Sequence, residues 1–143
     1  MINFGQLTDD IVLDCDAEPK TRFKIRSLRF SDLEKIEAAK DAVGTVLPSA
    51  LRRLQERVAA GEKTLDDDET SCLATTYRRA IAGEVKTCAL GVVEIDCRAV
   101  TPDEVEQMLD CAPASMRDAV RGELARRIMA LGAPDPKSGA PSA

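Results

Sequence analysis

The segment TRFKIRSLRFSDLEKIE, residues 21–37, contains the change in hydrophobic period on which the predicted fold depends. In residues 21–26 apolar and polar side chains alternate, which places Phe23 and Ile25 on one face of a strand. From Ser31 onward, apolar residues recur every three or four positions, as they do on one side of a helix. We therefore predict a strand that leads directly into a helix.

A second alternating segment precedes this strand. Residues 11–16 also alternate apolar with polar side chains, and residues 17–20 (Ala-Glu-Pro-Lys) are typical of a turn. We predict a β-hairpin with one apolar face and one charged face. The expected cross-strand pairs are Leu13 with Phe23, Ile11 with Ile25, Asp14 with Arg22, and Asp10 with Arg26.

Helical periodicity continues through most of the remaining chain. Five helices are predicted, and the clearest starts are the Ser31–Glu34 and Thr101–Glu104 capping boxes. The expected limits of the five helices are 31–44, 48–61, 66–83, 101–112 and 114–132. Between the third and fourth helices, residues 93–98 alternate and form either a short strand or an extended connection. The inward-facing residues are predicted to be Leu33, Ile36, Ala39, Val43, Leu51, Leu54, Val58, Leu73, Tyr77, Ala80, Ile81, Val105, Met108, Leu109, Met116, Val120, Leu124, Ile128 and Leu131.

The expected fold class is mainly α with an N-terminal β-hairpin (α+β), with about five helices around one core. Phe23, Ile25, Leu33, Ile36 and Leu54 are expected to share that core. The 143 residues suit one domain, which we assign to residues 1–131. Residues 132–143 lack large apolar side chains and are expected to form a flexible C-terminal tail.

The composition also limits the classes of function. The net charge of −5 argues against general nucleic-acid binding, which requires excess Lys and Arg to displace counterions. It also argues against a polybasic membrane-surface protein. The chain also has three Arg pairs, which would support DNA binding only if they shared one face: Arg52-Arg53, Arg78-Arg79 and Arg126-Arg127. All three pairs lie in the C-terminal halves of predicted helices, where positive charges interact favourably with the negative end of the helix dipole. We favour this explanation over DNA binding.

The cysteines indicate a reducing environment. The five cysteines have neither disulfide-framework nor zinc-ligand spacing, so we interpret them as unpaired, small apolar core residues. The N-terminus resembles no signal peptide, and no segment has the roughly 20 apolar residues of a membrane span. We therefore expect a cytoplasmic protein with protein partners and no membrane partner.

Catalytic and metal-dependent functions are not expected. The chain has no His, which rules out Ser-His-Asp and Cys-His arrangements, and it has no glycine-rich phosphate loop. The acidic run Asp66–Glu69 lacks the ligand spacing of a calcium loop and is better explained by the positive end of a helix dipole. We predict no catalytic residue, no cofactor and no metal.

The last predicted helix offers the candidate partner-binding residues. Leu124, Ile128 and Leu131 lie on one stripe of this helix, and no further structured element follows it in the sequence. We expect part of this stripe to remain available to a partner, although an amphipathic terminal helix is also commonly a wall of the core.

Two segments resemble tail assembly chaperones of long-tailed bacteriophages. Residues 21–37 resemble the short β element and helix start of these proteins, and residues 101–109, followed by Pro113 and one more helix, are similar to their second half. The resemblance implies a transient protein-binding factor in the host cytoplasm that binds the tape measure protein and recruits tail tube subunits. It identifies no individual binding residue. Two alternatives remain: a structural tail or connector subunit of a phage particle, and a small helical DNA-binding regulator.

Overall fold

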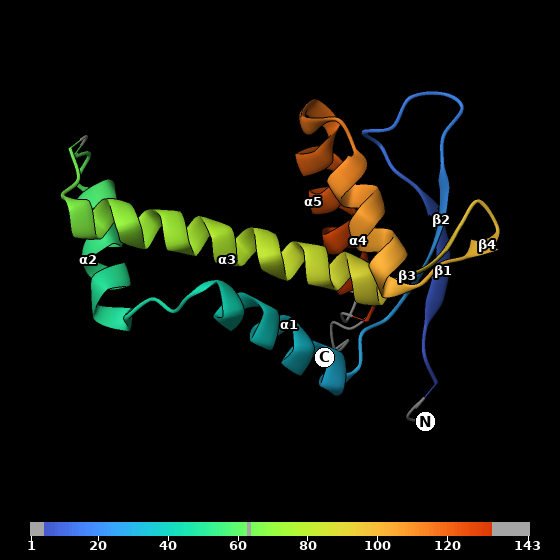
Figure 1. Cartoon of the computed structure of the whole chain (residues 1–143), viewed down its shortest axis with the longest axis horizontal. Helices are drawn as coiled ribbons and strands as arrows, with labels where there is room; N and C mark the ends of the chain where they lie inside the picture. Colours follow the sequence, from blue (N-terminus) through green and yellow to red (C-terminus); the bar gives the residue numbers. More distant parts are fainter. Residues whose placement is uncertain (1–4, 63, 133–143) are drawn as a thin grey trace, which may run out of the picture. The chain divides into compact units, whose positions relative to one another are not determined.

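The computed structural model describes residues 5–62 and 64–132 (Figure 1). The hairpin strands β1 (Thr8–Val12) and β2 (Arg22–Arg26) come first, followed by the helices α1 (Phe30–Val43), α2 (Pro48–Ala59) and α3 (Asp67–Gly91). The short strands β3 (Val92–Ile95) and β4 (Arg98–Ala99) precede α4 (Pro102–Cys111) and α5 (Ala114–Leu131). The predicted fold class, mainly helical with an N-terminal hairpin, is confirmed. Among the described helices, none is both long and apolar enough to cross a membrane.

The chain forms two compact units. Unit 1 contains the residues up to Leu33 and those from Glu84 onward, and unit 2 contains Glu34–Gly83. Both α1 and α3 contribute residues to each unit. That residues 1–131 behave as one domain stays a prediction. Within the predicted tail of residues 132–143, all positions after Gly132 lie outside the described residues.

Unit 1 is built on a four-stranded antiparallel sheet in the order β1-β2-β3-β4. Ile11 pairs with Phe23 and Asp9 with Ile25, so the predicted register is wrong by two residues. A shift of two keeps every side chain on its expected face, which is why the alternating pattern could not exclude it.

The loop between the hairpin strands is longer than the four-residue turn that we expected. The Asp16 carboxylate accepts hydrogen bonds from the N–H groups of Ala17 (2.9 Å) and Thr21 (2.8 Å). The Glu123 carboxylate of α5 accepts from the N–H groups of Asp14 (2.7 Å) and Cys15 (3.1 Å). These contacts hold the residues after Val12 in a loop and thereby set the register.

Residues 92–99 form a second, tight hairpin, which settles the open prediction for this region in favour of a strand. Asp96 and Cys97 have φ values of 49° and 66°, the left-handed conformation that both central residues of a type I′ turn adopt. The Asp96 carboxylate also accepts from the N–H of Arg22 at 2.9 Å, which ties this turn to β2.

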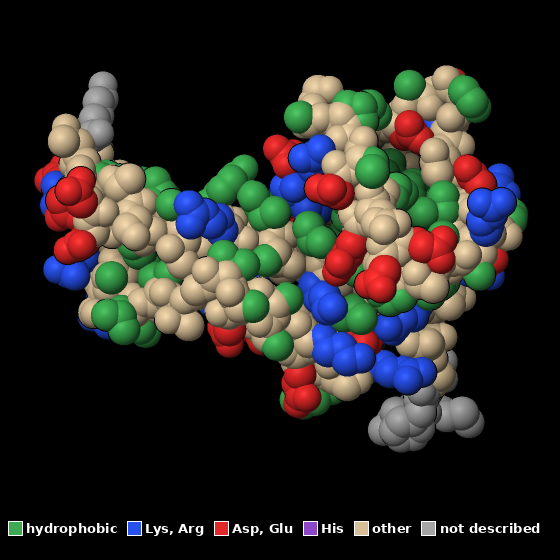
Figure 2. Space-filling model, in the orientation of Figure 1, with side chains coloured by type: hydrophobic (Ala, Val, Ile, Leu, Met, Phe, Trp, Pro, Cys, Tyr) green, Lys and Arg blue, Asp and Glu red, His purple; other side chains and the backbone are tan. Residues whose placement is uncertain are grey.

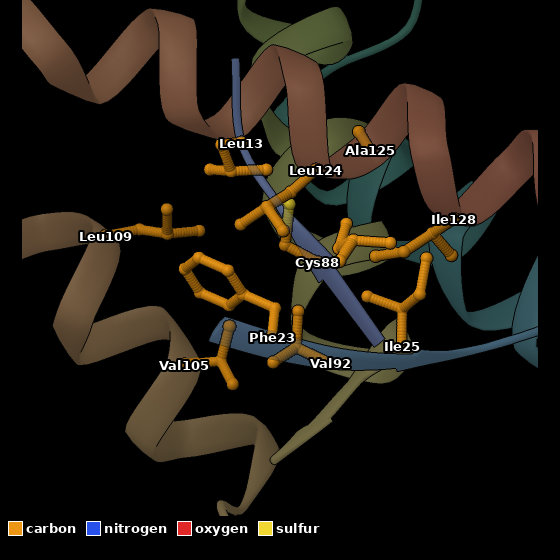
Figure 3. Close-up of a cluster of buried hydrophobic side chains, with 11 residues drawn as sticks. Leu13, Phe23, Ile25, Cys88, Val92, Val105, Leu109, Leu124, Ala125 and Ile128 are labelled. Atoms are coloured by element: carbon orange, nitrogen blue, oxygen red, sulfur yellow. The ribbon is translucent and has the colours of Figure 1, made fainter. Parts of the chain in front are cut away.

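The apolar face of the sheet packs against α4, α5 and the end of α3 (Figure 3). Buried side chains of this core include Leu13, Phe23, Ile25, Cys88, Val92, Val105, Leu109, Leu124 and Ile128. The thiol of Cys88 is fully buried, and burial, reinforced by the Glu84 carboxylate, raises its pKa to about 12. Cys88 is therefore a packing residue, as the sequence suggested.

Gly91, the last residue of α3, lies against Ile128 of α5. A Cβ atom placed on Gly91 would lie 2.6 Å from Cδ1 and Cγ2 of Ile128, closer than real atoms approach. The missing side chain therefore makes the space that Ile128 fills.

Two helix limits differ from the prediction. Helix α1 begins at Phe30, and Asp32 accepts from the N–H of Arg29 at 2.8 Å, so the predicted Ser31–Glu34 box does not start this helix. The predicted end of the third helix at Gly83 is wrong, because α3 continues to Gly91. Gly83 is buried, and a Cβ there would lie 3.1 Å from Cδ of Lys40, so close packing accounts for this glycine within the helix.

Candidate partner-binding surface

In unit 2, α3 exposes three of the four apolar side chains that we expected to be buried, and the fourth, Ile81, is half-buried. Leu73 is 48% exposed, Tyr77 is 60% exposed, and Ala80 is also exposed. Their spacing of four and three residues places them on one side of the helix, together with the exposed Thr70. We call Thr70, Leu73, Tyr77 and Ala80 the α3 stripe. The space-filling view shows exposed hydrophobic side chains on both units (Figure 2).

An adjacent side of α3, roughly 100° around the helix from the stripe, faces inward although it is largely polar. Glu69 and Cys72 are each 8% exposed. The Glu69 Oε1 atom lies 2.8 Å from Nη1 of Arg57 on α2, an ion pair between the two helices. One turn further on, Thr76 donates its hydroxyl to the carbonyl of Cys72 at 2.8 Å.

Arg79 extends this polar packing towards α1. Its Nη1 atom donates to Asp41 Oδ1 at 2.9 Å and to the Gly44 carbonyl at 2.5 Å. Gly44 has a φ of 144°, a conformation that favours glycine, and it follows the end of α1 as predicted. These polar contacts join α3 to α1 and α2 within unit 2, while the α3 stripe faces outward.

Further apolar side chains of unit 2 are exposed. Leu47, before α2, is 72% exposed, and Val58, near its end, is 56% exposed. Buried apolar residues of this unit include Ile36 and Leu54, but neither belongs to the core cluster that contains Phe23 and Ile25. The expectation of one core shared by these four residues and Leu33 is thus corrected.

A hollow of about 170 Å³, lined mostly by charged residues, lies between α2 and the start of α3. Its lining includes Arg53, Arg57, Asp66 and Glu69. Asp66 and Glu69 form the capping box of α3: Asp66 Oδ1 accepts from the N–H of Glu69 at 2.7 Å, and Glu69 Oε1 from that of Asp66 at 3.1 Å. The hydrogen bond from the Glu69 N–H lowers the pKa of the Asp66 carboxyl below its ordinary value. These carboxylates are thus engaged in starting the helix, as their sequence position suggested.

The structure places the three predicted binding residues of α5 in or against the core of unit 1. Leu124 is 0% exposed and Ile128 is 1% exposed, while Leu131 packs against the same cluster and is half-buried. The expectation that part of this stripe remains available to a partner is therefore corrected. Although α5 comes last in the sequence, the strands and helices that precede it cover Leu124 and Ile128. The exposed apolar side chains of α5 include Met116 and Met129.

In two of the three Arg pairs, the second arginine makes a polar contact within the fold. Arg79 binds Asp41, and Arg127 donates to the Val12 carbonyl at 3.1 Å. The pairs of α2 and α3 belong to unit 2, and Arg126-Arg127 belongs to unit 1.

All five cysteines are free. Cys72 and Cys88 are buried, whereas Cys15, Cys97 and Cys111 are exposed, so the interpretation of the cysteines as core residues is correct for two of them and wrong for the other three. Within residues 5–62 and 64–132, no three His, Cys, Asp or Glu side chains are grouped as metal ligands would be.

In comparisons with protein-family models, curated proteins and solved structures, no match to this chain was found. The α3 stripe is therefore identified from geometry alone. Leu73, Tyr77 and Ala80 were noticed in the sequence but assigned to the buried side of the helix, and Thr70 was not noticed. The available signal was the polar pattern Glu69, Cys72, Thr76 and Arg79, which also has helical spacing.

Proposed function

We propose that this protein is a non-catalytic binding factor that holds apolar helices of a partner protein on the α3 stripe. Its proposed role is that of a tail assembly chaperone of a long-tailed bacteriophage, which binds the tape measure protein and recruits tail tube subunits in the host cytoplasm. The observation that carries the binding role is the outward orientation of Leu73 and Tyr77. The chaperone role itself rests on the resemblance of residues 21–37 and 101–109.

The shape of the stripe supports a helical ligand. Leu73 and Ala80 are seven residues apart, which corresponds to about 10 Å along a helix. A partner helix that presents side chains every three to four residues can cover this length with two of its turns. Tyr77 offers an apolar ring and a hydroxyl group, a combination that favours reversible protein contacts.

The binding role can be tested by co-expression with the tape measure protein of the same phage genome. The wild-type chain should keep the tape measure protein in the soluble fraction, and Tyr77→Asp or Leu73→Asp should reduce this fraction at least about tenfold, as expected for a central interface residue. Circular dichroism should show unchanged helix content, because both side chains are exposed.

A matched control is available elsewhere in the chain. Phe30 is 78% exposed and lies outside unit 2, so Phe30→Asp makes the same kind of change on another surface. Equal loss with Phe30→Asp would contradict the assignment to the α3 stripe. A wild-type chain that leaves the tape measure protein insoluble, but remains in purified phage particles, would instead support the structural tail or connector subunit.

A further inference from the structure

Two exposed charged residues, Asp67 and Arg78, lie on one flank of the α3 stripe. Asp67 and Arg78 are 11 residues apart, so on an α-helix they lie about 16 Å apart and on the same side, within roughly 20° of each other. The ion pairs of unit 2 are Lys40–Glu37, Arg57–Glu62, Arg57–Glu69 and Arg79–Asp41 among the residues that the structure describes. Neither Asp67 nor Arg78 takes part in them.

From this arrangement, we propose that the α3 stripe binds a second copy of this chain, with the two α3 helices antiparallel. The two-fold axis of this dimer passes between Cys72 and Leu73, midway between Asp67 and Arg78. Two-fold symmetry then brings Asp67 of each copy next to Arg78 of the other, because residues on one flank of a helix face the same flank in an antiparallel pair.

The apolar contacts agree with this register. Leu73 lies almost on the two-fold axis and meets Leu73 of the second copy. Tyr77 packs beside Thr70, and Ala80 comes opposite Leu65, which is half-buried just before α3. The same two-fold therefore covers the stripe and pairs the charges at both of its ends.

The charges also disfavour the parallel arrangement. In a parallel two-fold dimer every interface residue faces its own copy, so Asp66, which continues the stripe by one turn, would face Asp66. Neither Asp67 nor Arg78 would then gain an opposite charge. The positions of these charges therefore favour the antiparallel dimer over the parallel one.

The dimer can be tested by sedimentation equilibrium of the full chain over a range of concentrations. The wild-type protein should approach twice the chain mass of 15.5 kDa as its concentration rises. Asp67→Arg or Arg78→Asp alone places like charges together at both ends, and each should weaken dimerisation about tenfold or more. The double variant, Asp67→Arg with Arg78→Asp, should restore it at low ionic strength.

Three results would overturn the proposal: a wild-type chain that is monomeric at every concentration, single reversals without effect, or a double variant no better than the singles. Arg52→Asp is the matched control, because Arg52 is an exposed arginine on α2 outside the stripe. The test is independent of the proposed function. Arg78→Asp should separate the copies yet leave Leu73 and Tyr77 free to hold the tape measure protein, whereas Tyr77→Asp should abolish both interactions.

Discussion

The Glu123 carboxylate shows how one buried charge fixes a loop. It is 7% exposed, it accepts the N–H groups of Asp14 and Cys15, and Arg127 Nε lies 3.8 Å from its Oε2. Burial alone would raise the pKa of Glu123, but the two N–H groups, together with the Cys15 thiol and Arg127, outweigh it. The pKa therefore lies below its ordinary value of 4.5.

Glu123→Gln should lower the free energy of unfolding at neutral pH by about 1–3 kcal/mol, because an amide has only one oxygen with which to accept the two N–H groups. A lowered pKa in the folded state means that the carboxylate stabilises the fold above about pH 4.5. This stabilisation is lost as the pH falls through the folded-state pKa. Wild type and variant should thus converge in acid.

Urea unfolding at pH 7 and near pH 3 measures this convergence. Asp110→Asn is a suitable control, because Asp110 is exposed on α4 and its side chain has no role in the loop. A constant difference between Glu123→Gln and wild type at the two pH values would mean that the ionised carboxylate is not what stabilises the loop.

Among the elements, α4 is the one that local sequence rules describe best. The Thr101 hydroxyl accepts from the N–H of Glu104 at 3.2 Å, Pro102 occupies the first turn, and Val105 and Leu109 are buried, all as predicted. Thr101→Ala should cost about 1 kcal/mol of stability, a typical value for the loss of such a cap.

Thermal or denaturant unfolding of Thr101→Ala checks this value, and Thr101→Ser should be nearly neutral because it keeps the accepting hydroxyl. If the serine variant were as unstable as the alanine variant, the methyl group of Thr101 and not its hydrogen bond would be the stabilising part.

Helix α3 shows where local rules fail. A glycine in a periodic segment suggested a helix end at Gly83, but close packing against Lys40 explains this glycine equally well, and the sequence offers no way to choose. The apolar residues were assigned inward because burial of apolar surface usually dominates packing. In unit 2 the buried side of α3 instead carries Glu69 and Cys72, and the ion pairs of Arg57 and Arg79 join this helix to residues of α2 and α1.

The candidate surface could not be predicted for the same reason. The sequence placed a binding site on Leu124, Ile128 and Leu131, which complete the core of unit 1. The hairpin, the strand-to-helix change and α4 were predictable because each depends on neighbours in the sequence. Contacts between distant segments, such as Glu123 with Asp14, decide which apolar faces remain exposed.

At the scale of the whole molecule, the two units differ in how they bury apolar side chains. Unit 1 has a continuous core cluster of buried side chains, whereas unit 2 exposes Leu47, Val58, Leu73 and Tyr77. Local opening requires less free energy where fewer apolar contacts are lost. We therefore expect unit 2 to open independently and more often than unit 1.

Amide hydrogen exchange followed by mass spectrometry measures this difference. Peptides from α2 should exchange at least about tenfold faster than peptides that cover residues 121–128 of α5. Equal protection of both segments would show one cooperative unit, as in the single domain that we predicted for residues 1–131.

The contact between Gly91 and Ile128 restricts which residues can replace each other at these two positions during evolution. A substitution at either position alone is constrained by the other, because even one methyl group at residue 91 would need the space that the Ile128 side chain occupies. Homologues that carry alanine at position 91 should therefore carry a smaller residue at position 128.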